Sequence, residues 1–169
     1  MSSFSRSIHP NNLIPIMTTN SAPCAFGTDL YGVIFEEPTA RHGMTPTLRT
    51  GVVEALLEFR GRFGELHVFS KLAPGIQSEV LGLLQLIDLP RQVGIPDSYW
   101  HFCATRQEKV AIINSSVCWY VDDRPEILAA IGGHVRGILF ANGRNYSSPV
   151  QWPVVSSWSA LSEYVARYS

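Results

Sequence analysis

Apolar runs alternate along the chain with segments whose apolar residues recur every three to four positions. The runs are typical of short buried strands and lie at Cys24–Asp29, Leu66–Phe69, Tyr99–Cys103, Val117–Val121 and Val135–Phe140. The helical spacing occurs at 51–62, 74–87, 106–113, 126–131 and from Trp158 to Tyr168. This alternation predicts an α/β fold of three layers, with a parallel sheet covered by helices on both faces.

The chain is long enough for one domain, because its 169 residues can bury a substantial core. Residues 1–22 are rich in Ser, Asn, Pro and Thr, and we interpret them as a flexible N-terminal leader. Residues 23–169 are then a single domain. No apolar run approaches the roughly 20 residues of a membrane-spanning helix, so we expect no membrane association.

The net charge limits the expected binding partners, and the cysteine pattern indicates the expected cellular compartment. The formal net charge is -1 and the basic residues are scattered, which gives no electrostatic support for binding nucleic acid. Cys24, Cys103 and Cys118 show no C-x-x-C spacing and no obvious pairing, and all lie in apolar stretches. We therefore expect reduced, buried thiols in a cytoplasmic protein, with a metal-binding or nucleophilic cysteine as the alternative.

Polar residues follow three of the predicted strands at the point where each strand ends. Asp29 ends the first strand, Ser70 and Lys71 follow the second, and Asp122 and Asp123 follow the strand at Val117–Val121. Each residue alone could cap a helix or shape a turn. Together they would meet at the carboxyl edge of a parallel sheet, where ligands bind in folds of this class.

Clustered carboxylates repel one another unless a cation neutralises them, and oxygen-ligated Mg²⁺ commonly does so. A bound Mg²⁺ polarises a phosphoryl group, which a carboxylate can attack at phosphorus. A nearby lysine and a serine hydroxyl stabilise the charge on the transferred group. The pattern therefore predicts phosphoryl chemistry with Mg²⁺ as cofactor.

The same residues resemble the four motifs of the haloacid dehalogenase superfamily. Asp29–Ile34 is similar to its first motif, D-x-D-G-T followed by a hydrophobic residue, and His67–Lys71 is similar to the second. Lys109 stands where the lysine of the third motif belongs, and Trp119–Leu128 resembles the fourth motif, a strand followed by paired acids. A receiver domain would place its acid pair first and its lysine last, which is the reverse of the order here.

The resemblance implies a Rossmann-like fold and a phosphatase that acts through an aspartyl intermediate. Asp29 would be the nucleophile, and Lys109 would steady both the nucleophile and the phosphate. Ser70 would bind the transferred group, with Lys71 and Tyr31 also on the substrate side.

The resemblance also implies a set of Mg²⁺ ligands. These would be the carboxylate of Asp29, the backbone carbonyl of Tyr31, and the side chains of Asp122 and Asp123. A backbone carbonyl is present whatever the side chain, so Tyr31 can still supply this ligand.

Two residues depart from the first motif. Tyr31 stands where family phosphatases carry the acid that protonates the leaving group and activates water, and Val33 replaces the usual Thr. A phenol with an ordinary pKa near 10 is poorly matched to this role. We therefore expect slow phosphatase turnover. A catalytically inactive protein that uses the fold for binding or scaffolding is the alternative.

A metal-independent dehalogenase is a weaker alternative, because such members carry D-x-Y-G-T in the first motif. They typically lack paired acids and enclose the substrate under a helical cap, whereas Asp122 and Asp123 are present here. Only about 40 residues separate Asp29 from Ser70, which leaves room for a minimal cap or none. Uncapped members often act on large substrates, so the phosphorylated substrate could be macromolecular. Arg106 and Arg124 could help to bind an anion, although surface ion pairs are the simpler interpretation.

Overall fold

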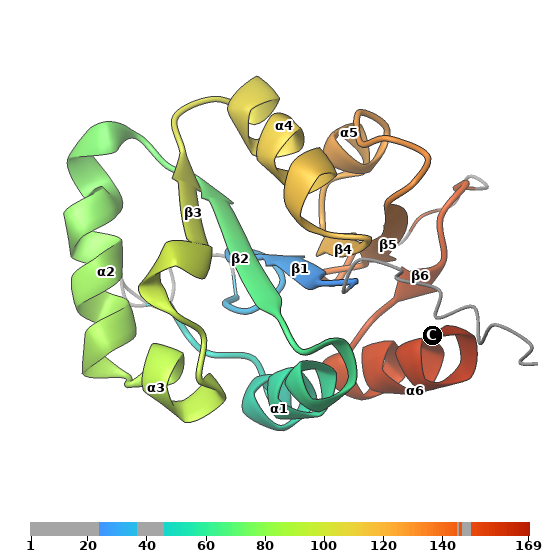
Figure 1. Cartoon of the computed structure of the whole chain (residues 1–169), viewed down its shortest axis with the longest axis horizontal. Coiled ribbons are helices and arrows are strands. Elements are labelled where there is room, and N and C mark those ends of the chain that lie inside the picture. The colour runs from blue at the N-terminus through green and yellow to red at the C-terminus, as the bar shows by residue number, and fades with distance from the viewer. Residues whose placement is uncertain (1–23, 37–45, 145, 147–149) are drawn as a thin grey trace, which may run out of the picture.

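The computed structural model describes residues 24–36, 46–144, 146 and 150–169. Strands and helices alternate along the described chain (Figure 1), as the apolar pattern predicts. The leader predicted at residues 1–22 lies outside the described residues.

A parallel sheet forms the middle layer, with strand order β3-β2-β1-β4-β5-β6. The strands are β1 (Phe26–Asp29), β2 (Leu66–Lys71), β3 (Trp100–Cys103), β4 (Trp119–Asp122), β5 (Arg136–Phe140) and β6 (Val154–Val155). β1 therefore lies between β2 and β4, so the three strands that precede the polar residues are neighbours. The predicted three-layer α/β fold is confirmed.

Helices cover both faces of the sheet (Figure 1). One face carries α1 (Val52–Phe63), α3 (Leu89–Val93) and α6 (Trp158–Tyr168), and the other carries α4 (Arg106–Ser116) and α5 (Pro125–Leu128). α2 (Gln77–Leu86) lies beside β3, and the short 3-10 helices are η1 (Pro74–Ile76) and η2 (Asp97–Tyr99). Between β1 and α1, the described residues form a turn with isolated bridges at Tyr31, Phe35 and Leu48.

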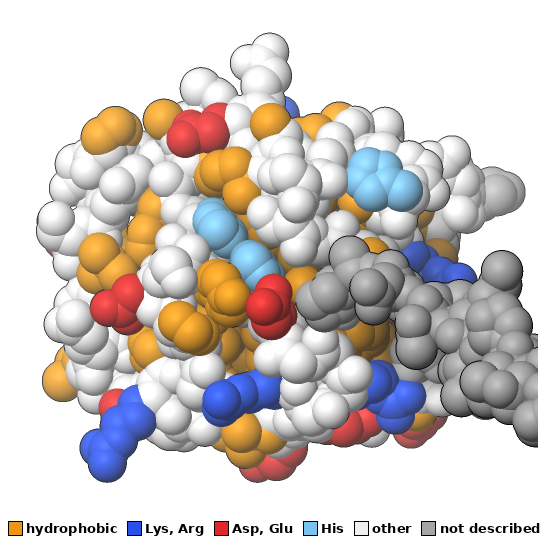
Figure 2. Space-filling view, in the orientation of Figure 1, with side chains coloured by type: hydrophobic (Ala, Val, Ile, Leu, Met, Phe, Trp, Pro, Cys, Tyr) orange, Lys and Arg blue, Asp and Glu red, His pale blue; other side chains and the backbone are white. Residues whose placement is uncertain are grey.

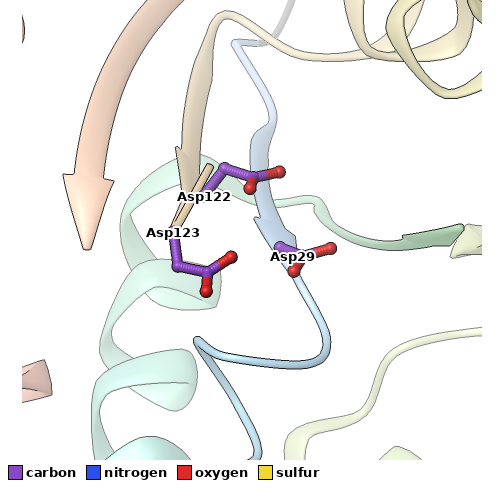
Figure 3. Close-up of side chains that lie close together, drawn as sticks. All are labelled: Asp29, Asp122 and Asp123. Carbon is purple, nitrogen blue, oxygen red and sulfur yellow. The ribbon is translucent and has the colours of Figure 1, made fainter. Parts of the chain in front are cut away.

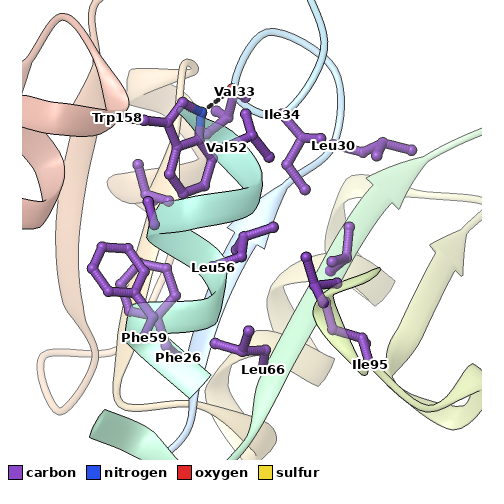
Figure 4. Close-up of a cluster of buried hydrophobic side chains, with 14 of the residues drawn as sticks. Phe26, Leu30, Val33, Ile34, Val52, Leu56, Phe59, Leu66, Ile95 and Trp158 are labelled. Atoms are coloured by element: carbon purple, nitrogen blue, oxygen red, sulfur yellow. Dashed lines mark hydrogen bonds between the residues drawn. The ribbon is translucent and has the colours of Figure 1, made fainter. Parts of the chain in front are cut away.

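The larger core cluster lies between the sheet and α1 (Figure 4). Phe26 of β1 packs on Phe59 of α1, with ring centroids 4.6 Å apart. The indole Nε1 of Trp158 donates a hydrogen bond to the carbonyl oxygen of Val33 at 2.8 Å. Val33 is fully buried in the turn that follows β1. The bond therefore ties α6 to this turn. The core thus anchors the segment that carries Asp29.

Three elements differ from the prediction. β6 was not predicted, because Ser and Pro residues surround its two strand residues and give no apolar run. α3 was not predicted, since Asp88 adopts a left-handed conformation that separates it from α2. α5 begins at Pro125 and ends at Leu128, so it is shorter than the predicted helix at 126–131.

Among the described residues, no helix has the length and apolar character needed to cross a membrane. On the face shown in Figure 2, Lys and Arg side chains are separated by other side chains and form no continuous basic surface.

The cysteines correct one prediction. Cys24 and Cys118 form a disulfide with their Cα atoms 5.4 Å apart, so the expectation of reduced thiols is wrong for this pair. Cys118 directly precedes β4 and Cys24 lies two residues before β1, and the pairing of these strands brings the cysteines together although 94 positions separate them. Cys103 is a free, buried thiol, and burial raises its pKa to about 11.

Thiol titration tests the disulfide. In denaturant without reductant, we expect Ellman's reagent to detect one thiol per chain, and after reduction all three of the sequence. The Cys118→Ser variant should show two thiols under both conditions. Three thiols in unreduced wild-type protein would contradict the pairing.

Candidate active site

The predicted site residues lie at the carboxyl edge of the sheet because the strands that carry them are neighbours. Asp29 is the last residue of β1, Asp122 is the last of β4, and Ser70 and Lys71 end β2. Thr28 of β1 pairs with Val121 of β4, so the acid that follows each one lies at the same level.

Three carboxylates from two strand ends point into a common space (Figure 3). One oxygen from each of Asp29, Asp122 and Asp123 lies within 4.8 Å of the others. Asp122 and Asp123 are fully buried and Asp29 is 6% exposed. The prediction that these acids converge is therefore confirmed, at separations that a single ion could bridge.

Lys109 of α4 is the buried cation of this cluster. Its Nζ lies 2.6 Å from Oδ1 of Asp29 and 2.8 Å from Oδ2 of Asp122. Burial lowers the pKa of Lys109, but the two carboxylates outweigh this effect and the net shift is upward. Lys109 therefore stays charged, and one buried ammonium group faces three buried carboxylates.

The pKa of Asp29 is raised by its burial and by the neighbouring acids. Burial is the main cause that raises it from 3.8 to about 7, and the charges of Asp122 and Asp123 add to the effect while Lys109 opposes it. Without a further cation, Asp29 would release its proton only near neutral pH. A divalent ion with oxygen ligands fits this donor set, because hard carboxylate oxygens are what such ions bind.

Tyr120 belongs to the site, although the sequence analysis missed it. Its hydroxyl donates a hydrogen bond to Oδ2 of Asp122 at 2.7 Å, and burial raises its pKa well above 10. The same carboxylate oxygen thus accepts from both Tyr120 and Lys109. A signal was present, because residues two apart in a strand lie on the same face, which places Tyr120 beside Asp122.

Two residues that follow β5 in the chain contact the Asp123 carboxylate. Nδ2 of Asn142, just beyond β5, lies 3.0 Å from Oδ2 of Asp123, and Nη2 of Arg144 lies 3.9 Å from the same oxygen. Asn142 in turn accepts a hydrogen bond from Arg49. The sequence analysis missed Asn142 as well, since nothing in the sequence alone places it beside the fourth motif.

The position that follows Tyr31 requires glycine. Its φ of +90° is strained for any residue with a side chain, and a Cβ at this position would overlap the Asp123 carboxylate. Its N–H donates to the carbonyl oxygen of Phe35 at 2.8 Å, which closes the turn after β1. Glycine therefore allows the turn to pass directly over the acid cluster.

A pocket of about 180 Å³ opens beside Asp29. Its walls include all the predicted catalytic and substrate-side residues together with two arginines and one apolar residue: Asp29, Tyr31, Ser70, Lys71, Arg106, Lys109, Arg124 and Ile127. Ser70 is buried, whereas Lys71 is exposed. Burial raises the pKa of Tyr31 above 10, so its hydroxyl keeps its proton at neutral pH.

Solved structures with known names share this fold. A D,D-heptose 1,7-bisphosphate phosphatase from B. bronchiseptica, complexed with magnesium and phosphate, aligns over 86% of this chain and 99% of its own, with 14% identity and a TM-score of 0.64. A cobalt-bound deoxy-D-mannose-octulosonate 8-phosphate phosphatase from Haemophilus influenzae aligns over 85% and 86%, with 14% identity and a TM-score of 0.53.

A further match is a putative haloacid dehalogenase-like hydrolase from Burkholderia xenovorans LB400, over 71% of this chain and 58% of its own, with 18% identity and a TM-score of 0.53. The chain has the haloacid dehalogenase-like fold. No family model matches the sequence, and no curated protein matches it significantly. The chain therefore adopts this fold with a sequence that differs widely from those of its structural neighbours.

The contact between Gly32 and Asp123 can be tested with matched alanine variants. Gly51 also has a positive φ, but its added Cβ would lie 3.7 Å from the nearest atom, at Trp158, an ordinary contact. We expect Gly51→Ala to cost about 1 kcal/mol from backbone strain alone. Gly32→Ala should cost about 2–4 kcal/mol, because overlap with Asp123 adds to the same strain.

Thermal unfolding of both variants, with and without Mg²⁺, measures this difference. Gly51→Ala should keep any stabilisation by Mg²⁺ that the wild type shows, and Gly32→Ala should lose it because Asp123 is displaced. Equal destabilisation of the two variants would show that the Gly32 contact is unimportant.

Proposed function

We propose that this protein is a divalent-metal-dependent phosphatase in which Asp29 is the nucleophile. The observation that carries the proposal is the buried group of Asp29, Asp122 and Asp123 beside a solvent-accessible pocket, with Lys109 bridging Asp29 and Asp122. Burying three acids against one lysine costs stability unless a cation or a ligand compensates. A buried acid cluster that lowers stability in this way is typical of a functional site.

Mg²⁺ is the proposed cofactor, held by the carboxylates of Asp29, Asp122 and Asp123 and by the backbone carbonyl of Tyr31. When bound, it would neutralise the acids and polarise the phosphoryl oxygens. Hydrogen bonds from Tyr120 and Asn142 support this proposal, because they orient Asp122 and Asp123 separately.

The reaction begins with the carboxylate of Asp29. One of its oxygens forms a bond to phosphorus while the bond between phosphorus and the leaving-group oxygen breaks. Lys109, at 2.6 Å from Oδ1 of Asp29, orients the carboxylate and offsets the charge that collects on the phosphoryl group. Ser70 and Lys71 bind the phosphoryl oxygens from the end of β2. Water then hydrolyses the aspartyl phosphate, which releases phosphate and restores Asp29.

Tyr31 limits the rate in this scheme. The leaving oxygen needs a proton, and the attacking water must lose one. Because burial raises the pKa of Tyr31, its hydroxyl is a weak acid and does not serve as a base at neutral pH. Turnover is therefore slow. The second candidate function is a phosphate-binding module, which uses the same site without turnover. This second function is favoured by the position of Tyr31 on the pocket wall.

Small phosphorylated molecules are the substrates that we favour. Two of the structural neighbours bear the names of phosphatases that act on sugar phosphates, one a bisphosphate and the other an 8-phosphate. These names favour a small substrate over the macromolecular one also considered from the sequence. The buried acid group argues against a metal-independent dehalogenase, which needs no such cluster.

Phosphatase assays with p-nitrophenyl phosphate and Mg²⁺ test the proposal. We expect weak activity in the wild type, none in Asp29→Asn, and none in the presence of EDTA. Tyr31→Asp should raise turnover by about 10²-fold or more, because it restores an acid and base near neutral pH. Tyr31→Phe is the matched control and should not raise it.

The outcomes separate the candidate functions. Activity that appears only in Tyr31→Asp would identify an intact site that lacks its acid and base. No activity in any variant, together with phosphate binding that depends on Mg²⁺, would support the binding module. Activity that persists in Asp29→Asn would contradict the role of Asp29.

A further inference from the structure

An apolar groove lies between α4 and α5, beside the pocket of Asp29. These two helices cover the same face of the sheet (Figure 1). The groove has a volume of about 420 Å³, and its apolar walls are formed by Val110 and Ala111 of α4, Ile127 of α5, and Ala130 just after α5. Ile127 is buried and Val110 is half-buried, whereas both alanines are exposed. Because the alanine side chains are small, they leave the space between the helices open.

The groove and the pocket of Asp29 meet at two side chains. Arg106 and Ile127 line both spaces. Ile127 is the aliphatic residue in the wall of the pocket, which otherwise consists of charged, hydroxyl and phenol side chains. An apolar group on a ligand of the pocket therefore finds apolar contact along Ile127, and that direction leads into the groove.

The charged groups at this junction pair with one another. Oε1 of Glu126 lies 3.4 Å from Nη2 of Arg106 and 3.7 Å from Nη1 of Arg124. All three side chains are about half exposed, and ion pairs at such positions yield to a ligand at little cost. The methylene stem of an arginine also provides apolar surface, so Arg106 is compatible with an apolar ligand that passes beside it.

The polar side chain at the other end of the groove is already used inside the protein. Asn114 lines this end, about two turns of α4 away from Arg106. Its Oδ1 accepts a hydrogen bond from the N–H of Gly132 at 2.8 Å, which joins α4 to the turn after α5. The groove thus presents mainly apolar atoms, and their removal from water favours a ligand with an apolar group.

The length of the groove indicates the size of that group. From Arg106 to Asn114, α4 rises by about 12 Å. An extended alkyl chain advances about 1.3 Å per carbon, because its C–C bonds of about 1.5 Å zigzag. About nine carbons therefore span the groove.

We propose that the groove binds the apolar part of the substrate, so that the substrates are phosphate monoesters of medium-length alkyl chains. The phosphoryl group binds beside Asp29, and the chain passes Ile127 and runs between α4 and α5. This inference rests on the proposed function for the position of the phosphoryl group, and it names the class of substrate for that site.

A pair of non-hydrolysable ligands tests the proposal without turnover. Butylphosphonate and octylphosphonate have the same phosphonate and differ by four methylene groups. Calorimetric titration in saturating Mg²⁺, below the concentration at which octylphosphonate forms micelles, gives the two dissociation constants. Their ratio isolates the contribution of the longer chain, and excess inorganic phosphate should displace both ligands.

We expect octylphosphonate to bind wild-type protein about fifteenfold more tightly, because each methylene group that is half removed from water improves binding about twofold. The double variant Ala111→Glu/Ala130→Glu places charges in the groove, and the ratio should fall to about two or less. Ala166→Glu is the matched control, because Ala166 is an exposed helical alanine of α6, on the other face of the sheet. It should keep the wild-type ratio.

A wild-type ratio near one, or a ratio that survives in the double variant, would overturn the proposal. Octylphosphonate that inorganic phosphate fails to displace would also overturn it, because its phosphonate would then lie outside the pocket. A ratio near one, together with a dimer that the double variant dissociates in sedimentation, would assign the groove to a second copy of the chain.

Failure of the proposed function has a different result. No turnover of p-nitrophenyl phosphate, with the ratio still near fifteen, leaves the groove standing as part of the site of a binding protein. No binding of either phosphonate would overturn both proposals.

Discussion

The ion pairs of Lys109 with Asp29 and Asp122 are the constraint on which the site depends. They join the ends of β1 and β4 to α4, and they do so inside the protein, where an unpaired carboxylate is costly. One ammonium group compensates only part of the charge of three buried acids, and the pKa of Asp29 is raised to about 7, mainly by burial and further by Asp122 and Asp123. The unbalanced charge makes a divalent cation the natural partner of this cluster, and it links the proposed Mg²⁺ dependence to an observed feature of the protein.

The strands β1, β2 and β4 could be predicted from the sequence because each is a short apolar run bounded by polar residues. Their neighbouring positions in the sheet explain why Asp29, Ser70, Asp122 and Asp123 meet at one edge, as expected. β6 escaped prediction because its two residues show no period, and its position depends on pairing with β5. α3 was missed because its start depends on the left-handed conformation of Asp88, which no hydrophobic pattern reports.

The residues that support the acids were harder to predict than the acids themselves. Tyr120 reads as an ordinary core aromatic of a strand, and only the structure shows its hydroxyl on Asp122. Asn142 and Gly32 act on Asp123 across long separations in the chain, so their roles require the folded arrangement. The pairing of Cys24 with Cys118 has the same origin, because it follows from the adjacency of β1 and β4.

A crystal structure of the protein grown with Mn²⁺, with anomalous scattering used to locate the ion, tests the central claim most directly. The account predicts one strong anomalous peak within about 2.5 Å of a carboxylate oxygen of Asp29 and of at least one of Asp122 and Asp123. Ordered carboxylates without any such peak, at Mn²⁺ concentrations that saturate ordinary metalloenzymes, would contradict it. Lys109, together with Arg144 beside Asp123, would then compensate the buried acids without a metal ion.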